Sequence, residues 1–582
     1  MTRFATLALA LLLAAPALAQ TPTVTVSADI TSNTTWSASQ VYLLDGLIYV
    51  RPGATLTIEP GTIIKGREVP SSATGDLASG LVIMIDANIE ANGRADAPIV
   101  MTAEADDVSD PSDLGPDDRS LWGGLLVFGR ATTNSTPAIT NVEGIPASDD
   151  TRFGCDDVTF MCDDDDDSGT IRYVSVRHGG FGFEPGSEIN GMTFGAVGRG
   201  TTIEYVEVYA NSDDAFEFFG GTTQAKYLVG AFNGDDTFDT DRGFRGKFQY
   251  GFSINNPGND AGRCFENDGG VSSLGGEDAT PYARPIYSNI TCIGAGIGAD
   301  GSQLGEDSNS AAMQLRDNTG GAVYNSIFTD YPGSALNIEA LSSGEDSENR
   351  FGTNSEGDDL VIRNNLFFGF GAGSTAADLV DNDSDNSAGR QAEIESAFGA
   401  ANTIANPQLA TIGRASGSNL DPRPLASGPA ASGAEFTGNA LAGDAFFEVV
   451  DFLGAFEPTA SAADNSNPTW LGGWTALSQT GVLSGQATPA ETGPAGDRIG
   501  LEAFPNPVRG AGTVRFALDR AQTVRLALYD ALGRQVAVVA EGAFAAGAAT
   551  AALPTAGLAP GVYVLRLAGE TVAVSQTVSV VR

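Results

Sequence analysis

The chain has 582 residues, 42% of them hydrophobic, so it is long enough for two or more domains with buried cores. It carries 73 Asp and Glu against 31 Lys and Arg, which gives a formal net charge of −42. This charge repels nucleic acid, anionic lipid and acidic polysaccharide at long range, and it fits either calcium binding or a saline habitat.

Residues 1–19 are predicted to be a secretory signal peptide. Arg3 precedes the apolar run LALALLLAAPALA, which ends in the small-residue pattern Ala17-Leu18-Ala19. The run is too short to span a bilayer, and no later stretch approaches the ~20 apolar residues that a transmembrane helix needs. We therefore expect export, cleavage before Gln20 and no transmembrane span in the mature chain.

Four cysteines in an exported chain indicate disulfides rather than thiol chemistry. Three pairings are possible, and spacing favours the two local ones, Cys155–Cys162 and Cys264–Cys292. The run DDDDD at 163–167 directly follows the first pair and is a weak candidate metal site, with a solvated loop as the alternative.

A 22-residue repeat predicts the fold. IEYVEVYAN (203–211) aligns with AKYLVGAFN (225–233) and KFQYGFSIN (247–255). Short β-rich segments at this period, broken by Gly, Asn and Asp, are typical of a β-solenoid, whereas helical repeats need a 3.6-residue periodicity. We predict an all-β chain in which each residue stacks on its counterpart in the next coil.

Stacking makes specific neighbours predictable. One column of asparagines should form an interior amide ladder, and Glu204 should lie over Lys226 as an opposite-charge pair. The asparagines are Asn211, Asn233 and Asn255.

The same repeat brings carboxylates together. Asp213 recurs as Asp235 and Asp214 as Asp236, and each stacked pair would cost about 3 kcal/mol at an effective dielectric near 20. A bound cation would reverse the sign of that energy, and carboxylate oxygens are the ligands that calcium prefers. Three interpretations stay open: a calcium site, solvent-facing acids, or a polysaccharide-cleaving site. The candidate metal ligands are Asp213, Asp214, Asp235, Asp236, Asp239 and Asp241.

An enzyme is the alternative hypothesis, because parallel β-helices include lyases and hydrolases of uronic-acid polymers. Its candidate catalytic residues are Asp213, Asp235, Asp236, Arg242, Arg245 and Lys247. The single histidine, His178, lies beside glycines and is more typical of a turn. With no complete hydrolase motif, the sequence favours a structural, adhesive or glycan-binding protein over an enzyme.

Residues ~40–475 resemble a family of secreted right-handed parallel β-helix proteins whose activity is poorly defined. The resemblance is carried by phrases such as GATLTIEPGTIIKG (53–66), WGGLLVFG (122–129), DDTFDTDRGFRGKFQ (235–249) and TWLGGWTAL (469–477). It implies a parallel β-helix with capping segments over 20–477, with coils extending to about residue 456.

The remainder of the chain is predicted to form a linker followed by a small β-sandwich. Residues 478–498 are rich in Ser, Thr, Gly, Pro and Ala, and 499–582 contain short alternating strands with turn signals. FPNP, VRLALYDALGR and GLAPGVYVLRL resemble the type A sorting domain of the type IX secretion system, an Ig-like sandwich. The resemblance implies contact with that secretion machinery and delivery to the outside of a Gram-negative cell, either released or attached to surface lipopolysaccharide. An ordinary carbohydrate-binding or spacer sandwich is the alternative.

Overall fold

The computed structural model describes most of the chain in two units, residues 1–488 and 489–582. In the first it describes residues 21–483, apart from 72–75, 185–186, 258–261, 300–310, 342–345, 353–358, 385–389 and 462–468. In the second it describes 501–581, apart from 505–507, 510–511, 519–521, 530–533, 545–546, 556–557, 560 and 570–572. The predicted signal peptide and linker lie outside the described residues, except for 478–483.

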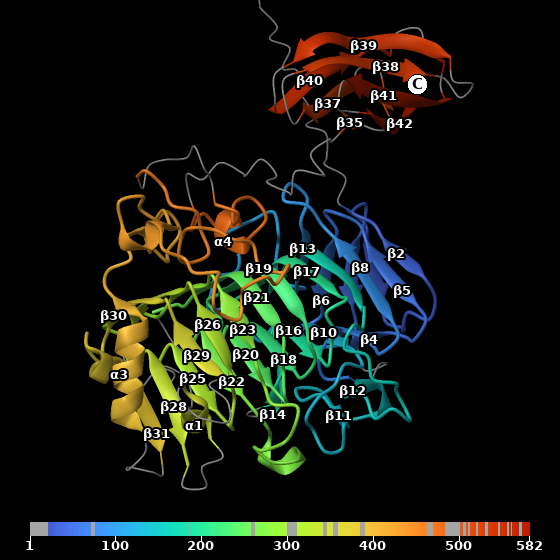
Figure 1. Cartoon of the computed structure of the whole chain (residues 1–582). Coiled ribbons are helices and arrows are strands. Elements are labelled where there is room, and N and C mark those ends of the chain that lie inside the picture. The colour runs from blue at the N-terminus through green and yellow to red at the C-terminus, as the bar shows by residue number, and fades with distance from the viewer. Residues whose placement is uncertain are drawn as a thin grey trace, which may run out of the picture. The chain divides into compact units, whose positions relative to one another are not determined.

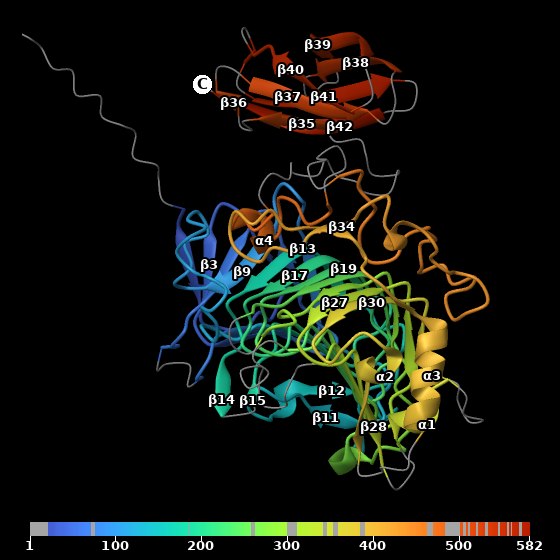
Figure 2. The same ribbon diagram turned by 90° about the vertical axis from the view of Figure 1, so that its left-hand side faces the viewer.

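The first unit is a parallel β-helix, as the repeat predicts (Figures 1 and 2). One of its sheets has ten parallel strands among the described residues, contributed by successive coils, and we call it the ten-stranded sheet. Its strands are β4 (Leu47–Val50), β7 (Gly80–Ile83), β10 (Leu125–Phe128), β16 (Met192–Gly195), β18 (Phe216–Phe219), β20 (Phe238–Asp241), β22 (Phe265–Asp268), β25 (Met313–Arg316), β28 (Leu336–Ala340) and β31 (Val380–Ser384).

The other eighteen strands form two parallel ladders that meet at a bend. In four successive coils the bend falls on a tyrosine with φ between 48° and 63°, a conformation that L-residues rarely adopt. The four rings stack at centroid distances of 4.2–4.9 Å, which offsets part of that strain. The tyrosines are Tyr173, Tyr205, Tyr227 and Tyr250.

Each short strand of this sheet belongs to one ladder, whereas four long strands pass through the bend and belong to both. The eighteen strands are β1 (Thr23–Val26), β2 (Thr34–Trp36), β3 (Val41–Leu44), β5 (Thr55–Ile58), β6 (Ile63–Gly66), β8 (Asn88–Asn92), β9 (Ile99–Ala103), β13 (Gly169–Arg177), β17 (Thr202–Tyr209), β19 (Gln224–Ala231), β21 (Lys247–Ile254), β23 (Ile286–Ser288), β24 (Thr291–Ile293), β26 (Gly321–Tyr324), β27 (Ile327–Tyr331), β29 (Leu360–Arg363), β30 (Leu366–Phe370) and β32 (Thr403–Ile404).

The core lies inside the coils and repeats with them. Phe216 pairs in register with Phe238, which pairs with Phe265, and all three side chains are fully buried. Because strand residues alternate between the two faces, every second residue of the ten-stranded sheet points outward. That outward face carries the candidate site.

Residues 130–166 form an insertion against the outward face of the ten-stranded sheet. The insertion contains the antiparallel pair β11 (Ile139–Asn141) and β12 (Arg152–Gly154), joined through the 3-10 turn Asp149–Thr151. A second hairpin, β14 (Gly182–Glu184) with β15 (Ser187–Glu188), lies beside the insertion (Figure 2). Further along the chain lie the 3-10 turn Ser272–Leu274 and the short helices α1 (Ser347–Arg350), α2 (Ala376–Leu379) and α3 (Gln391–Ala401).

The coils end at β32, earlier than the sequence suggested. The described residues of 405–483, that is 405–461 and 469–483, add no coil and run back along the two ladders instead, and we call them the strap. Glu435 contacts Asn325, Glu448 contacts Gln249, and the Trp474 ring lies 5.7 Å from Tyr173. The strap contains β33 (Leu409–Thr411), β34 (Asp421–Pro424), the 3-10 turn Pro429–Ala431 and α4 (Ala476–Gln479).

The strap also changes one predicted ion pair. Glu204 does stack on Lys226 in register. The Lys226 ammonium, however, lies 2.8 Å from the carboxylate of Glu448 in the strap, and Glu204 pairs with Arg172 at 3.5 Å. A distant segment therefore supplies the partner that the coil alone was expected to provide.

The second unit has two sheets around one core, a small β-sandwich, and its pairings are antiparallel apart from one short parallel pair. The three-stranded sheet is β35 (Leu501–Phe504), β37 (Gly512–Leu518) and β40 (Gly547–Leu553). The five-stranded sheet is β36 (Val508–Arg509), β42 (Ala573–Val581), β41 (Gly561–Gly569), β38 (Gln522–Tyr529) and β39 (Gln535–Phe544). Val514 and Phe516 from the first sheet share a core with Leu526 and Leu565 from the second. No helix among the described residues is long and apolar enough to cross a membrane.

Candidate functional site

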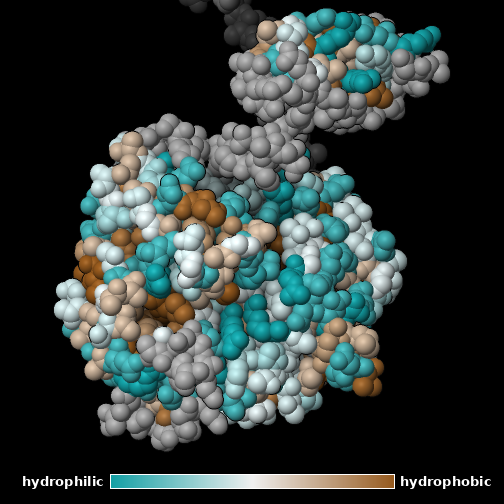
Figure 3. Space-filling view, in the orientation of Figure 1, coloured by the Kyte–Doolittle hydropathy of each residue, from teal (hydrophilic) through white to brown (hydrophobic). Residues whose placement is uncertain are grey.

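The outward face of the ten-stranded sheet changes character along the helix. In its first coils it is apolar and fully buried, with Val82, Leu126 and Phe128 packed against the insertion. In β18, β20 and β22 five of the six outward positions carry carboxylates, Phe219 being the exception, and hydrophilic residues gather over β18 and β20 (Figure 3). We call these residues the acidic strip: Glu217, Asp239, Asp241, Glu266 and Asp268.

Three aspartates meet where the strip begins. One carboxylate oxygen from each of Asp213, Asp214 and Asp235 lies within 4.8 Å of the others. The 22-residue coil places them, because the backbone N–H of Asp236 donates to Asp214 Oδ1 at 2.8 Å across one coil. The Asn211 amide also donates to the Asp214 carbonyl at 2.9 Å, which fixes the turn.

A second group shares Asp214 and adds Glu217 and Asp239, again with oxygens within 4.8 Å. Asn190, 4% exposed, donates its amide N–H to Glu217, while its own Oδ1 is buried without a hydrogen-bond partner. Asp239 Oδ1 is buried and unpartnered as well. We call the five residues of the two groups the acid cluster: Asp213, Asp214, Asp235, Glu217 and Asp239.

Burial and mutual repulsion disfavour the charged forms in this region. Burial, followed by the neighbouring carboxylates, raises the pKa of Asp213 to about 7 and the pKa values of Asp214, Glu217 and Asp239 well above their usual range. Burial also raises the pKa of Asp268 to about 8, although Arg316 opposes the shift. Groups of this kind either hold protons or hold a cation.

Two of the aspartates predicted as ligands pair with arginines instead. Asp236 is fully buried, accepts from the backbone N–H of Arg263, and lies 3.2 Å from that guanidinium. Asp241 lies 3.5 Å from the guanidinium of its neighbour Arg242. Both carboxylates thus have an arginine partner, whereas Glu217 and Asp239 form no ion pair among the described residues.

The cations considered for catalysis lie elsewhere. The Arg242 guanidinium covers the Phe219 ring at 4.3 Å, and Arg245 pairs with Asp164 at 3.3 Å. Lys247 pairs with Asp444 of the strap. None of the three forms an ion pair with Asp213, Asp214, Glu217 or Asp239 among the described residues.

The predicted asparagine column is buried in the turns. Asn211, Asn233 and Asn255 are at most 3% exposed. Asn233 Oδ1 accepts from the backbone N–H of Asn211 at 3.0 Å, whereas the Asn255 amide bonds to the carbonyl of Gly262. The contacts run from side chain to backbone rather than from amide to amide.

Both expected disulfides are present. Cys155–Cys162 closes a loop of the insertion, and Cys264–Cys292 connects the turn before β22 to β24. His178 is buried in a turn at φ 58°, with Nδ1 2.7 Å from the carbonyl oxygen of Asp118. Burial lowers its pKa, and these contacts fit the turn role.

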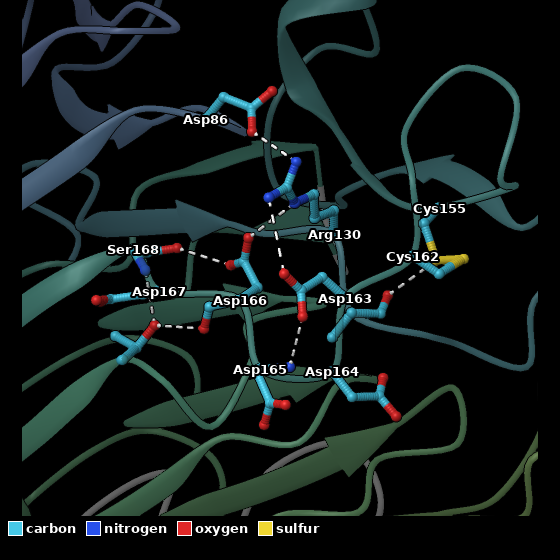
Figure 4. Close-up of polar contacts among 12 residues, drawn as sticks. Asp86, Arg130, Cys155, Cys162, Asp163, Asp164, Asp165, Asp166, Asp167 and Ser168 are labelled. Carbon is cyan, nitrogen blue, oxygen red and sulfur yellow. Dashed lines mark hydrogen bonds and ion pairs between the residues drawn. A yellow bond between two sulfur atoms is a disulfide. The ribbon is translucent and has the colours of Figure 1, made fainter.

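The DDDDD run, 163–167, is surrounded by arginines and backbone N–H groups (Figure 4). Arg130 lies 3.8 Å from Asp163 and 3.5 Å from Asp166, and Arg199 lies 2.5 Å from Asp165. Asp164 accepts from the backbone N–H of Thr132 at 2.9 Å, and Asp167 from that of Gly169 at 2.9 Å. The run works as a structural loop held by arginines and amides.

The acid cluster fits a hard divalent cation. Calcium binds oxygen ligands at about 2.3–2.6 Å, so ligands on opposite sides of one ion lie at most about 5 Å apart. Each group of three carboxylates meets that spacing, and the Asn190 amide oxygen is a further donor of the same kind. The spacing and the donor chemistry therefore agree with calcium.

Sequence reasoning missed Glu217, Asn190, Glu266 and Asp268. A usable signal was the alternation in FEFF and FEND, where Phe216 and Phe265 point inward, so that Glu217 and Glu266 must point outward. Asn190 carried no such signal, because it lies in a turn two coils of chain away from Asp235.

Comparison with known proteins covers both units. The model of the pectate-lyase-like β-helix domain matches residues 28–411, and that of the secretion system C-terminal sorting domain matches residues 502–581. No curated protein sequence matches the chain.

Among solved structures, the full-length tailspike protein 2 of the Escherichia coli O157:H7 bacteriophage CAB120 is 9% identical, with a TM-score of 0.25. That match covers 95% of this chain, which spans 64% of the tailspike's length. The enzymatically active domain of tailspike protein 2 from bacteriophage CBA120 is 10% identical, with coverages of 95% and 72% and a TM-score of 0.25. These scores carry no argument about function.

Proposed function

The chain belongs to the pectate-lyase-like β-helix family and ends in a sorting domain that directs it to the secretion machinery and the outside of a Gram-negative cell, and from this premise we propose that it is a calcium-dependent glycan-binding protein. The acid cluster is the calcium site, and the acidic strip beside it contacts the glycan. The ligand class is surface lipopolysaccharide or another extracellular glycan. The protein itself is either released or attached to the cell surface after sorting.

The observation that carries this proposal is the sharing of Asp214 between two groups of buried carboxylates. Such a cluster is repulsive when empty and favourable around a divalent ion. Among the described residues, no arginine or lysine forms an ion pair with Asp213, Asp214, Glu217 or Asp239. The charges of Arg242 and Arg316 oppose the raised pKa values of Glu217 and Asp239 but are outweighed by burial and the neighbouring carboxylates. A cation bound there also leaves coordination positions for the hydroxyl or carboxylate oxygens of a sugar.

Hydrolysis of a glycan is the second candidate. Carboxyl groups with raised pKa values beside one another, here Glu217 and Asp239, suit an acid and a nucleophile or base. Lyase chemistry is less favoured, because the cations that would act as its base, Arg242, Arg245 and Lys247, are held by Asp241, Asp164 and Asp444.

Calcium titration by calorimetry, followed by a panel of bacterial and plant cell-wall glycans with calcium or chelator, tests the proposal. Asp214→Asn keeps the shape of the shared ligand and should weaken calcium binding at least tenfold and remove glycan retention. Asp165→Asn, in the DDDDD run, is the matched control and should behave like wild type. Calcium binding that is equal in both variants would reject the proposed site. Glycan fragments released by wild type but not by Glu217→Gln would favour the hydrolase.

A further inference from the structure

A hollow lies between the strap and the start of β17 and β19, on the outer side of the ladders and away from the ten-stranded sheet. Its volume is about 300 Å³, which is at the small end of the range for ligand sites in proteins. No residue of the acid cluster or the acidic strip lines it. The lining side chains that carry polar or aromatic groups include Arg199, Thr202, Glu204, Gln224, Lys226 and Phe446.

The register of the coils builds the floor of the hollow. Glu204 of β17 is in register with Lys226 of β19. Thr202 and Gln224 stand two positions earlier on the same two strands. Strand residues alternate between the two faces, and the intervening Ile203 is buried in the core. These four side chains therefore point outward, into the hollow.

The charged groups of the hollow already have partners. Three ion pairs border it, Arg199 with Asp165 at 2.5 Å, Lys226 with Glu448 at 2.8 Å and Glu204 with Arg172 at 3.5 Å. The charges of these pairs cancel, in a chain whose formal net charge is −42. An ionic ligand would have to displace one of the partners, so the balance of charge favours a neutral ligand.

The neutral polar groups of the floor are the ones left without partners. Among the described residues, neither the Thr202 hydroxyl nor the Gln224 amide forms a hydrogen bond, and both side chains are at least partly exposed. A hydroxyl and an amide can each donate and accept, as can the neighbouring hydroxyls of a sugar ring. The two groups are therefore matched to a polyhydroxylated ligand.

The strap adds an aromatic wall to this polar floor. Phe446 lines the hollow, and the Lys226 ammonium lies 5.1 Å from the centre of its ring. The face of an aromatic ring is apolar and carries partial negative charge, so it suits the C–H face of a sugar. A flat apolar surface beside free hydrogen-bonding groups distinguishes this hollow from a site for a simple ion.

We infer that the hollow is a second, calcium-independent binding site, which takes a single neutral sugar unit. The sugar ring packs on Phe446, and its hydroxyl groups form hydrogen bonds with the Thr202 hydroxyl and the Gln224 amide. The small volume admits one sugar or one unit of a chain rather than a long stretch. The site is made by the coils and the strap together, and it needs no metal ion.

Titrations of the full-length protein in the presence of a chelator test this site, by calorimetry and by ligand-observed NMR. The probes are glucose, galactose, mannose and N-acetylglucosamine, with glucuronate, a sugar phosphate and a free amino acid as charged counterparts. We expect a neutral sugar to bind once per protein in the millimolar range, and the charged counterparts to bind at least tenfold more weakly. Binding this weak does not retain a glycan without the calcium site.

Two variants and a matched control locate the binding. Gln224→Ala and Thr202→Val should each weaken it at least tenfold, because each removes a hydrogen-bonding group. Thr170 is in register with Thr202 one coil earlier and does not line the hollow, so Thr170→Val should bind like wild type. Neither Gln224 nor Thr202 makes a side-chain hydrogen bond that folding would lose, and unchanged melting temperatures separate a lost contact from a lost fold.

A preference for glucuronate, the sugar phosphate or the amino acid would overturn the inference, because charge balance would then not select the ligand. Failure of every neutral sugar to bind would overturn it too, as would equal losses in Gln224→Ala and Thr170→Val. Asp214→Asn should leave this binding unchanged. Sugar binding that needs both calcium and Asp214 would place the sugar at the acid cluster instead. The absence of calcium binding would remove the proposed function and leave this inference standing.

Discussion

The acid cluster and the DDDDD run are equally dense in carboxylates, yet the fold treats them in opposite ways. The run lies in a loop, where Arg130, Arg199 and backbone N–H groups reach its side chains. The cluster lies on stacked coils, where each carboxylate's nearest charged neighbours include the carboxylates above, below or beside it. A parallel β-helix repeats residues in register, so it concentrates like charges that a loop disperses.

The number of carboxylates alone therefore does not identify a candidate metal site. The two regions differ in whether arginines and backbone N–H groups pair with those carboxylates. Asp236 shows the same difference close to the acid cluster. It pairs with Arg263, and it belongs to neither of the two carboxylate groups. Predictions that add or remove partners therefore test the distinction directly.

The largest effect is expected for Arg263→Ala. This change leaves Asp236, which is fully buried, as an uncompensated charge, and breaking a buried pair costs about 3–5 kcal/mol of unfolding free energy. Urea unfolding measures the loss. Arg199→Ala removes the partner of the exposed Asp165 and serves as the control, with a loss well below 1 kcal/mol. Similar losses in the two variants would mean that burial does not separate the two regions.

A pH effect is expected for Asp166, the buried member of the run. Burial raises its pKa to about 6, above that of the unfolded chain near 3.9, so the folded protein holds this proton more tightly. Its contribution to stability is complete below about pH 4 and is lost as the pH rises through about 6, a change of about 3 kcal/mol.

Unfolding free energies of wild type and Asp166→Asn at pH 4 and pH 7 measure this term. The variant should lose less stability than wild type between the two pH values, while Asp167→Asn should follow wild type. A pH dependence that is the same in all three proteins would show that Asp166 titrates normally.

Calcium should stabilise the native state through the cluster and not through the run. Binding at a hundredfold excess over the dissociation constant adds about 2.7 kcal/mol to the unfolding free energy. Glu217→Gln with Asp239→Asn should abolish this gain, and Asp163→Asn with Asp165→Asn should retain it. Melting temperatures with calcium and with chelator provide the measurement, and a wild-type protein indifferent to both would exclude the metal site.

The coil and its register could be predicted from the sequence, because both follow from a local 22-residue repeat. The 22-residue interval places Phe216 on Phe238 and Asp214 beside Asp236 without any long-range information. The two disulfides and the C-terminal sandwich likewise follow from short spacings and alternating strands.

Partners supplied by distant segments could not be predicted in this way. Arg263 pairs with Asp236 from 27 positions later in the chain, outside the 22-residue register, and Glu448 pairs with Lys226 from the strap. The strap itself has no repeat, and its position depends on Trp470 and Trp474 packing on the tyrosine stack, a contact that only the folded coil creates. Of the six aspartates proposed as calcium ligands, Asp213, Asp214, Asp235 and Asp239 lie in the two carboxylate groups, whereas Asp236 and Asp241 pair with arginines, and calcium binding itself stays a prediction.

The smallest effect is expected for Asp165→Asn, the control used above. The Asp165 side chain is 72% exposed and the Arg199 side chain 45% exposed, so water and salt already screen their pair. Exposed pairs of this kind contribute about 0–1 kcal/mol, and we expect a change in unfolding free energy of about 0.5 kcal/mol or less, falling further at high salt. Urea unfolding at low and at high ionic strength measures the change in unfolding free energy and its dependence on salt. A loss of several kcal/mol would mean that the run is a cooperative network like the buried pair of Asp236 and Arg263, and the contrast between the two acidic regions would then fail.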